Sequence, residues 1–556
     1  MSTLLRKDLD KYIPRKEQQD CIDFIDSEYN KNKDSKIFLL NLPVGTGKSH
    51  LALMISDWYR KTISKGARVD IITNSKILQD QYVETYNSIN DLKGKENYKC
   101  EQFSCSCSEG IEFNRLNKSK CEYCPYSYAK ESYLNGNVSL TNFYLYILYA
   151  LYLPEMMEMR DSKVLIVDEA HSFDDVMTNF ITIKITETIV KKLKFSNEKE
   201  IIKQLKKVKT IQSYIEFLEF LEGEITSTIV DVENALSSEK RSVKRDKRDN
   251  KLSKLFNSKN SDSKLMSIIT DLTNYKSKIE VFLKEYKANP DNWVLESNWN
   301  EKTKQNELSL EPIWAYDYLD KYVFSKYDMI FLMSGTILNK ELFCELNGLD
   351  SQKAVYYSIE SPFDVKNRPI YYMPLGKMSY KQKEETFKNY VPYLNKVLKK
   401  YSDKKGIIHT NSFELASWIS RDLSDPRLVY HDSSNKDEVL ENHKSKTNVP
   451  SVIVSPSMGT GVSLDNDSAR FQVIAKIPYP SLASKKNKMR QKMNPEWYSW
   501  RTIAELIQMS GRIVRNNKDW GDTIIIDGSF SDVLKYSGHL LPKWFQSAIK
   551  RVNVKV

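Results

Sequence analysis

The sequence predicts an α/β protein with two parallel-sheet domains, the first of which carries two inserted segments. Short apolar runs recur along the chain, and a turn and a helix-like segment follow them. Such runs are typical of parallel strands that helices cover on both faces. The first group comprises Ile37–Leu40, Val69–Ile72, Val164–Val167 and Met329–Met333, and the second comprises Ile407–Ile408, Val452–Val454, Val473–Ala475 and Thr523–Ile526.

Length, charge and composition restrict the class of protein. A chain of 556 residues is too long for one core, so we expect about three to four domains. Its hydrophobic fraction of 40% and charged fraction of 28% are typical of a globular protein, and its net charge of +11 favours a polyanionic partner. No N-terminal signal is visible, and the longest apolar run, Phe143–Leu153, is too short to span a bilayer. We therefore expect a cytoplasmic protein without membrane contact.

A glycine-rich loop with phosphate-binding character follows the first apolar run. Leu42–Ser49 reads LPVGTGKS and precedes a helix-like segment, His50–Tyr59. Glycines let backbone N–H groups face phosphate oxygens, and the helix N-terminus adds partial positive charge. Lys48 is expected to reach the β- and γ-phosphates of a nucleotide, and the Ser49 hydroxyl is expected to bind Mg²⁺. The loop therefore predicts a nucleotide site at Gly45, Thr46, Gly47, Lys48 and Ser49, with a chance glycine turn as the alternative.

Two adjacent carboxylates follow the strand at Val164–Val167. We expect Asp168 to bind Mg²⁺ through water and Glu169 to polarise the attacking water as a general base. His171 follows at a position from which it could couple the nucleotide to the rest of the protein. An exposed acidic turn is the alternative, which the phosphate loop upstream disfavours.

Polar residues also follow the strand at Val69–Ile72. Thr73, Asn74 and Ser75 suit phosphate contacts at the carboxyl end of a strand. Taken alone, an ordinary helix N-cap at Asn74 or Ser75 is the better interpretation.

Five of the seven cysteines fall in one polar window, Lys99–Pro125. This clustering differs from the dispersed cysteines of a disulfide-stapled secreted domain. The window has little hydrophobic periodicity and contains no histidine, so we expect thiolate ligation of a metal. Four thiolates suit either Zn²⁺ or an iron–sulfur cluster, and free structural cysteines are the alternative. The cysteines are Cys100, Cys105, Cys107, Cys121 and Cys124.

A helical insertion is expected from about Phe173 to Glu311. Apolar residues recur at helical spacing among lysines and glutamates, for example at Leu205, Val208 and Ile211. Within it, the basic stretch Ser237–Lys264 could contact phosphates or form a solvated loop.

The second group of strands ends near a segment rich in cationic residues. Gln508, Arg512 and Arg515 stand at i, i+4 and i+7, so we expect them to share one helical face. Two arginines fixed beside a phosphate loop are what an arginine-finger role needs. Ordinary surface charges are the alternative.

The order of these motifs resembles that of the superfamily 2 helicases, specifically the XPD/DinG-like iron–sulfur helicases, over almost the whole chain. Gly94–Cys100 and Cys124–Tyr126 resemble the family's segments around its first and last cluster ligands. The matching segments are the adenine-side element at Arg15 and Gln18, motif I at Gly45–Ser49, motif Ia at Thr73–Gln81, the DEAH form of motif II at Asp168–His171, motif III at Ser334–Thr336, motif IV at His409–Ser412, motif V at Met458–Asp465 and motif VI at Gln508–Arg515.

The resemblance implies two RecA-like parallel-sheet domains, with an iron–sulfur domain and a helical Arch-like domain inserted in the first. It favours a 4Fe–4S cluster over zinc, held by Cys100, Cys107, Cys121 and Cys124, with Cys105 as an alternative to Cys107. The implied boundaries are 1–90, 131–175 and 312–352 for the first RecA-like domain, 91–130 for the iron–sulfur domain, 176–311 for the Arch-like insertion and 353–556 for the second RecA-like domain.

Three positions depart from the family pattern. Leu42 replaces the small residue that usually opens motif I, and we expect this to alter packing behind the loop without loss of function. In motif V, Thr460 and Ser463 stand where the family usually has Glu and Asp, which weakens the coupling role implied for those positions.

By resemblance, the chain is expected to be an ATP-dependent DNA helicase that uses Mg²⁺ and moves 5′ to 3′ on single-stranded DNA. It would unwind forked duplexes as a monomer, in DNA repair or replication. Two alternatives remain: a nucleic-acid-stimulated ATPase, translocase or RNA helicase without productive DNA unwinding, and a metal-stapled DNA-binding sensor with a slow ATP switch. The expected catalytic residues are Lys48, Asp168, Glu169, Gln508, Arg512 and Arg515. The last three of these argue against the sensor.

Overall fold

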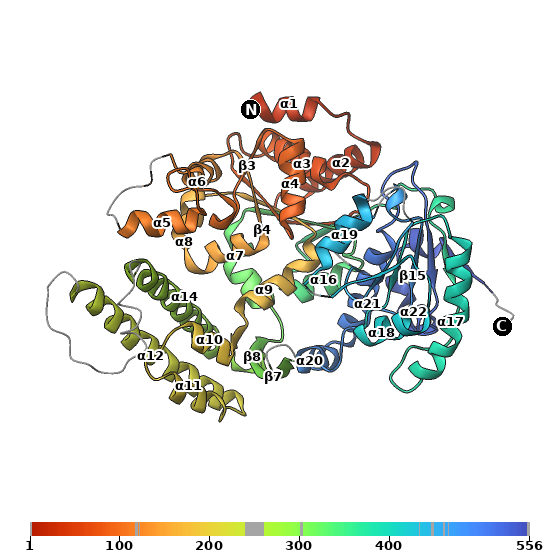
Figure 1. Ribbon diagram of the computed structural model, residues 1–556. Coiled ribbons are helices and arrows are strands. Elements are labelled where there is room, and N and C mark those ends of the chain that lie inside the picture. Colours follow the sequence, from red (N-terminus) through yellow and green to blue (C-terminus); the bar gives the residue numbers. More distant parts are fainter. Residues whose placement is uncertain are drawn as a thin grey trace.

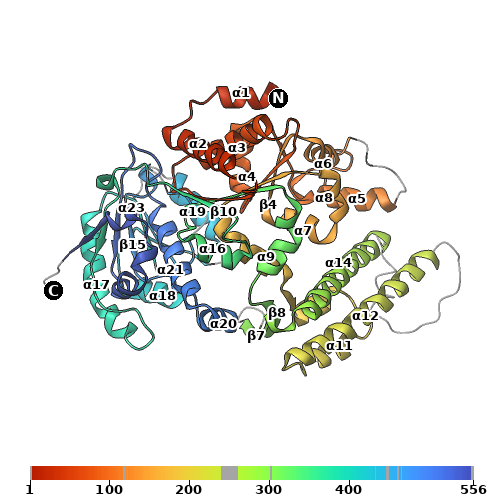
Figure 2. The same cartoon turned by 180° about the vertical axis from the view of Figure 1, so that it is seen from behind.

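The fold is seen in a computed structural model of the chain (Figure 1). The structure describes residues 3–116, 121, 123–238, 261–300, 304–432, 434–445, 450–459, 462–464 and 466–552. Two seven-stranded parallel sheets form the body of the protein, and a helical arm extends from the first sheet domain (Figures 1 and 2). The predicted α/β class with two sheet domains is confirmed.

The first sheet has the strand order β10-β1-β9-β5-β2-β4-β3, and all of its pairings are parallel. Along β1, Leu39 packs into one hydrophobic cluster, whereas Phe38 and Leu40 pack into another, because successive side chains point to opposite faces. The sheet is thus buried on both sides. Its strands are β1 (Ile37–Asn41), β2 (Val69–Thr73), β3 (Ile89–Asp91), β4 (Val138–Asn142), β5 (Val164–Asp168), β9 (Met329–Ser334) and β10 (Ala354–Ser358).

Helices cover both faces of this sheet. The apolar run at 143–153 forms helix α7, which buries one face while Tyr144 and Leu148 are exposed; Asn142 caps it by accepting a hydrogen bond from the Leu145 amide at 3.1 Å. The helices and turns of this domain are α1 (Thr3–Asp10), α2 (Lys16–Lys31), α3 (Lys48–Thr62), α4 (Lys76–Thr85), α6 (Pro125–Asn135), α7 (Phe143–Tyr152), α8 (Pro154–Arg160), η2 (Ala170–Ser172), α9 (Phe173–Ile181), α15 (Tyr316–Tyr322), η4 (Phe324–Lys326) and α16 (Lys340–Asn347).

Two segments are inserted in this domain. The first, between β3 and β4, holds the cysteines and contains η1 (Lys95–Asn97) and α5 (Cys107–Leu116). The second forms the arm and contains α10 (Glu187–Lys192), α11 (Glu198–Leu205), α12 (Ile211–Ser238), α14 (Ser261–Ala288) and η3 (Pro290–Asn292). The root of the arm is a three-stranded antiparallel sheet, which the sequence did not predict, formed by β6 (Ile183–Ile185), β8 (Gln305–Pro312) and β7 (Trp293–Asn300).

The second sheet has the order β13-β14-β12-β15-β16-β11-β17, again with parallel pairings. Its strands are β11 (Ile370–Tyr372), β12 (Gly406–His409), β13 (Leu428–Tyr430), β14 (Val452–Ser455), β15 (Phe471–Ile474), β16 (Asp522–Ile525) and β17 (Ile549–Arg551). Its helices and turns are η5 (Val365–Asn367), α17 (Lys383–Lys400), α18 (Phe413–Asp422), α19 (Lys436–Ser445), η6 (Asn466–Ser468), α20 (Lys485–Met493), α21 (Pro495–Ser510), α22 (Phe530–Ser537), η7 (Gly538–Leu540) and α23 (Lys543–Gln546).

One predicted boundary needs correction. The first RecA-like domain was expected to end at residue 352, but β10 pairs with β1 in the first sheet, from Ala354 opposite Ile37 to Ser358 opposite Asn41. The first sheet therefore includes residues up to Ser358. The other boundaries remain predictions. Among the described residues, no helix is long and apolar enough to cross a membrane.

Candidate nucleotide-binding site between the two domains

Four predicted motifs lie at one edge of the first sheet. In the sheet order, β1, β9, β5 and β2 are consecutive and parallel, so their carboxyl ends are neighbours. The phosphate loop follows β1, Ser334 ends β9, Asp168 ends β5 and Thr73 ends β2. Ligands of open α/β sheets bind at such an edge.

The phosphate loop has the backbone conformation that its glycines predict. Gly45 and Gly47 lie in the left-handed region at φ 88° and 75°, and α3 begins directly after Gly47. The Thr46 hydroxyl donates to the Pro43 carbonyl at 2.9 Å, which closes the turn. The strand–loop–helix context predicted for this segment is confirmed.

Arg15 and Gln18 contact the loop from the start of α2. The Gln18 amide donates to the Gly47 carbonyl at 2.9 Å, and the Arg15 guanidinium donates to the Gly45 carbonyl. The Gln18 side chain also accepts from the Arg15 backbone amide at 2.9 Å, which fixes the two residues together. Their expected role beside an adenine remains a prediction.

Lys48 pairs with Glu169 across the site. The Lys48 Nζ lies 3.1 Å from Glu169 Oε1, and both groups are largely buried. Burial raises the pKa of Glu169, but Lys48 and then His171 outweigh it and hold this pKa at about 2. Burial likewise lowers the pKa of Lys48, yet Glu169 and Asp168 raise it overall. Both side chains are therefore charged, and they neutralise each other in the free protein.

Asp168 has an unsatisfied oxygen that suits a metal ion. Tyr82 donates to its Oδ2 at 2.9 Å, whereas Oδ1 is buried and has no hydrogen-bond partner in the part of the chain that the structure describes. Burial, opposed by Lys48, raises the pKa of Asp168 to about 6. A buried carboxylate oxygen beside the Lys48 cation fits the donor chemistry of Mg²⁺. Sequence reasoning missed Tyr82, because no local pattern links residues 86 positions apart.

His171 joins the two domains. The Gln508 amide, on α21 of the second domain, donates to His171 Nε2 at 2.6 Å. His171 Nδ1 lies 2.9 Å from the Ser334 hydroxyl and 3.4 Å from Glu169. Burial lowers the pKa of His171 to about 4, so the ring is neutral near pH 7. The structure thus brings motifs II, III and VI into one contact.

The arginines of motif VI do not share a helical face with Gln508, contrary to the expectation. Helix α21 ends at Ser510 with Gly511 as its C-cap, so Arg512 and Arg515 lie beyond the helix. The apolar residues Ile513 and Val514 are buried after this end, and the chain turns to bury them. The arginines nevertheless act on the charges of the site, because Arg515 lowers the pKa of Lys48 and Glu169 raises that of Arg512.

Arg512 also contacts motif V. Its guanidinium donates to the carbonyls of Gly459 at 3.1 Å and Val462 at 2.7 Å. Burial, reinforced by Arg515, lowers its pKa to about 10. Ser463 is described, whereas the expectation for Thr460 lies outside the described residues.

The remaining sequence expectations have mixed outcomes. Leu42 is 1% exposed and its amide donates to the Ser334 carbonyl at 2.7 Å, so its side chain belongs to the core behind the loop. Ser75 is the N-cap of α4 and accepts from the Leu78 amide at 3.3 Å, which confirms the capping interpretation. Most of the basic stretch 237–264 lies outside the described residues.

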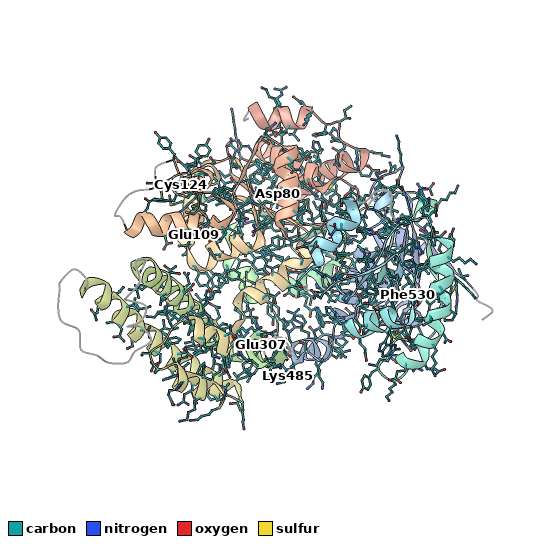
Figure 3. All side chains as sticks on the ribbon, viewed as in Figure 1. Asp80, Glu109, Cys124, Glu307, Lys485 and Phe530 are labelled. Atoms are coloured by element: carbon teal, nitrogen blue, oxygen red, sulfur yellow. The ribbon has the colours of Figure 1, made fainter. Side chains whose placement is uncertain are left out.

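The five cysteines lie around α5 and the start of α6 (Figure 3, in which Cys124 and Glu109 are labelled). Cys107 Sγ lies 3.7 Å from Cys124 Sγ, and the Asn114 amide donates to Cys121 Sγ at 3.0 Å. Within the described residues, no three histidine, cysteine, aspartate or glutamate side chains group closely enough to hold a metal ion.

The thiol chemistry of this segment nonetheless suits a metal ligand. Cys124 caps α6, and although burial raises the pKa of its thiol, hydrogen bonds from Ser127 lower it overall. A lowered pKa favours the thiolate, which is the form that binds metals. Burial raises the pKa of Cys107 to about 12, so this thiol is neutral without a metal.

Comparisons with known proteins describe the class to which this two-domain fold is similar. Residues 392–548 match the helicase C-terminal domain family, and residues 11–212 match the family described as type III restriction enzyme, res subunit. The chain is 22% identical to a probable ATP-dependent helicase of Methanocaldococcus jannaschii, over 92% of each chain.

Solved structures provide a more specific comparison of the fold. The chain is similar to a structure named XPD helicase, with 17% identity, a TM-score of 0.60 and coverage of 97% of this chain and 99% of the other. It is also similar to Xpd4 of S. tokodaii, with 15% identity, a TM-score of 0.57 and coverage of 97% and 100%. These matches agree with the resemblance found in the sequence and show that the chain has the fold of these XPD structures.

Proposed function

We propose that the protein is an ATP-dependent DNA helicase that moves 5′ to 3′ on single-stranded DNA. The observation that carries this proposal is the hydrogen bond from Gln508 to His171, which connects motif VI of one domain to motif II of the other. A site divided between two domains lets nucleotide binding change their relative position. The probable helicase relative and the similar XPD structures support the same class of activity.

The hydrolysis step is proposed to begin with an exchange of partners at Lys48. In the free protein, Lys48 holds Glu169 at 3.1 Å. When Lys48 turns to the phosphates of a nucleotide, Glu169 loses the cation that most strongly depresses its pKa. Glu169 then becomes a stronger base and can accept a proton from the attacking water. Asp168 and Ser49 would hold Mg²⁺, which neutralises developing charge on the phosphates.

Arg512 and Arg515 are proposed to complete the site from the second domain. Both act on the charges around Lys48 and Glu169 already in the free protein. Closure of the domains would bring their guanidinium groups onto the transferring phosphoryl group, where arginine stabilises negative charge. Release of the products would let the domains separate, and one such cycle would advance the protein along the strand.

The cysteine segment is proposed to hold a 4Fe–4S cluster, with zinc as the less favoured metal. Cys100, Cys107, Cys121 and Cys124 would be its ligands, and Cys105 is the alternative to Cys107. Such a cluster would stabilise the fold of a polar segment that buries little apolar surface. By resemblance, this domain (91–130) and the Arch-like arm (176–311) would flank the point where the duplex separates.

A strand-displacement assay tests the function. Forked DNA and duplexes with a single 5′ or 3′ overhang are incubated with the protein and ATP, beside matched RNA substrates. We expect displacement from the fork and the 5′ overhang, and none by Lys48→Ala, which should still bind DNA. Displacement only from the 3′ overhang would contradict the polarity. DNA-stimulated ATP hydrolysis without displacement would favour the translocase, and hydrolysis near zero would favour the sensor.

A further inference from the structure

Arg490, on α20 of the second domain, is buried against the first domain. It is 1% exposed. Its guanidinium lies 3.0 Å from Asp174 on α9 and donates to the Thr178 hydroxyl at 3.4 Å and to the Ile313 carbonyl. The planar group also lies 4.8 Å from the ring centre of Trp314 and 5.3 Å from that of Trp497. The buried guanidinium is therefore paired with a carboxylate, hydrogen-bonded and packed against two aromatic rings, and such interactions offset the cost of burying a charge.

A second arginine forms an ion pair with the next residue of α9. Arg501, on α21, lies 2.6 Å from Asp175 and 2.9 Å from Glu505 on its own helix. Arg490 is itself 3.8 Å from Asp175, so the two arginines and the two aspartates form one charged seam between the domains. The cations come from the second domain and the aspartates from the first.

This seam adjoins motif II. Helix α9 begins at Phe173, two residues after His171, and Asp175 stands one helical turn beyond His171. Arg501 and Gln508 stand about two turns apart on α21, so they lie on similar faces of that helix. Helix α21 consequently meets the motif II segment at two successive points, Arg501 with Asp175 and Gln508 with His171.

Helix α20 is also anchored on the root of the arm. The Ser484 hydroxyl and the Lys486 amide both donate to Glu296 on β7 at 2.9 Å, and Lys485 donates to the Leu295 carbonyl at 2.8 Å. Figure 3 labels Lys485 and Glu307 in this region. Helix α20 is thus held on the first domain at its start and again at Arg490, so Arg490 fixes the start of α21 relative to α9.

We propose that Arg490 and Arg501 are positioning residues for ATP hydrolysis, which hold α21 in register with motif II so that Gln508 meets His171. The proposal rests on the proposed ATPase function. Neither arginine is placed at the reacting atoms, and both act through the Gln508–His171 contact. Displacement of a catalytic group by about 1 Å lowers turnover by up to about 100-fold, so loss of the seam should affect kcat.

Steady-state hydrolysis of ATP in the presence of single-stranded DNA is the first test. Arg490→Gln is expected to lower kcat by about 10- to 100-fold. The KM for ATP should stay within about threefold of the wild type, because the phosphate loop and its contacts with Arg15 and Gln18 lie in the first domain. Arg490→Lys keeps the charge but loses the planar fork, so its kcat should fall less.

The matched control is Arg421→Gln, which removes an exposed arginine that pairs with its neighbour Asp422. Its kcat should equal that of the wild type. A kcat of Arg490→Gln within about twofold of the wild type, or a rise in KM at unchanged kcat, would overturn the proposal. If Arg490→Gln lacks a cooperative melting transition, Arg490→Lys and Arg501→Lys carry the same test.

Hydrogen–deuterium exchange gives a second measurement that needs no activity. Arg490→Gln should accelerate exchange in α21 and in residues 168–178, while α3, which carries the phosphate loop, stays as protected as in the wild type. Unchanged exchange in α21 would overturn the positioning role. A wild-type protein without DNA-stimulated hydrolysis would instead refute the proposed function, and the exchange experiment would still decide whether Arg490 positions α21.

Discussion

Replacing Asp168 by asparagine is expected to stabilise the metal-free protein while abolishing ATP hydrolysis. The side chain is 1% exposed, and burial raises its pKa to about 6 in spite of the nearby Lys48. An unfolded aspartate has a pKa of about 3.9. Because the folded-state value is the higher one, the contribution of this group to stability is largest at low pH and is lost as the pH rises through about 6.

The size of the effect follows from the two pKa values. The raised pKa of Asp168 lowers the free energy of unfolding by about 3 kcal/mol at pH 7, where the folded-state carboxyl is ionised, and by roughly half as much at pH 5, where it is mostly protonated. Asparagine has no such cost, so the stability gained by Asp168→Asn should be larger at pH 7 than at pH 5 by about 1 kcal/mol. This difference is independent of any change in packing that the amide introduces, since packing does not vary with pH.

Thermal melting in the presence of EDTA measures this difference. For a domain of about 150–250 residues, 1 kcal/mol corresponds to a change in Tm of about 2–4 °C. The gain in Tm of Asp168→Asn should therefore be about 2–4 °C larger at pH 7 than at pH 5. Asp34→Asn, at an exposed turn, is the control and should leave Tm unchanged at both values. An equal shift for Asp168→Asn at the two pH values would refute the reasoning.

Three further predictions concern the metal segment, the phosphate loop and DNA binding. Cys107→Ser should reduce bound iron and acid-labile sulfide per protein, because this thiol is buried and lies 3.7 Å from Cys124 Sγ. Cys105→Ser should keep both the iron and the sulfide. Equal losses in the two variants would contradict the ligand assignment. Gly45→Ala should weaken ATP binding in a titration far more than Gly66→Ala. Both glycines have positive φ. A β-carbon at Gly45 would lie 2.0 Å from the Phe363 ring, whereas a β-carbon at Gly66 would have no atom within 4 Å. DNA affinity should fall steeply between 50 and 200 mM salt, about 10-fold or more, and a flat response would contradict a phosphate-binding surface.

The sequence predicted four consecutive strands of each sheet and the first half of the site, because these depend on local pattern. Uninterrupted apolar runs marked central strands such as β5, and glycines marked the loop after β1. The outer strands were missed, because they are short, only partly buried or, as in β4, carry polar residues; these strands are β3, β4, β10, β11, β13 and β17. The sheet at the root of the arm was missed because β7 is buried in its first half and exposed in its second.

Contacts between distant segments were beyond sequence reasoning. Gln508 was recognised as a functional residue, but its partner His171 is 337 positions away. Arg490 and Asp174 are 316 positions apart, so no local pattern links them. The prediction that Arg512 shares a helical face with Gln508 was wrong for a local reason. Helix α21 ends before Gly511, and the buried side chains of Ile513 and Val514 turn the chain away from the helix axis.

The most direct test of a nucleotide site shared by two domains is DNA-stimulated ATP hydrolysis by Arg515→Ala, measured together with its affinity for ATP. Arg515 lies in the second domain, whereas the residues expected to bind the phosphates lie in the first. We predict that kcat falls by about 10³-fold or more while ATP binding remains within about tenfold of the wild type. Hydrolysis at the wild-type rate by Arg515→Ala would contradict a site completed by the second domain.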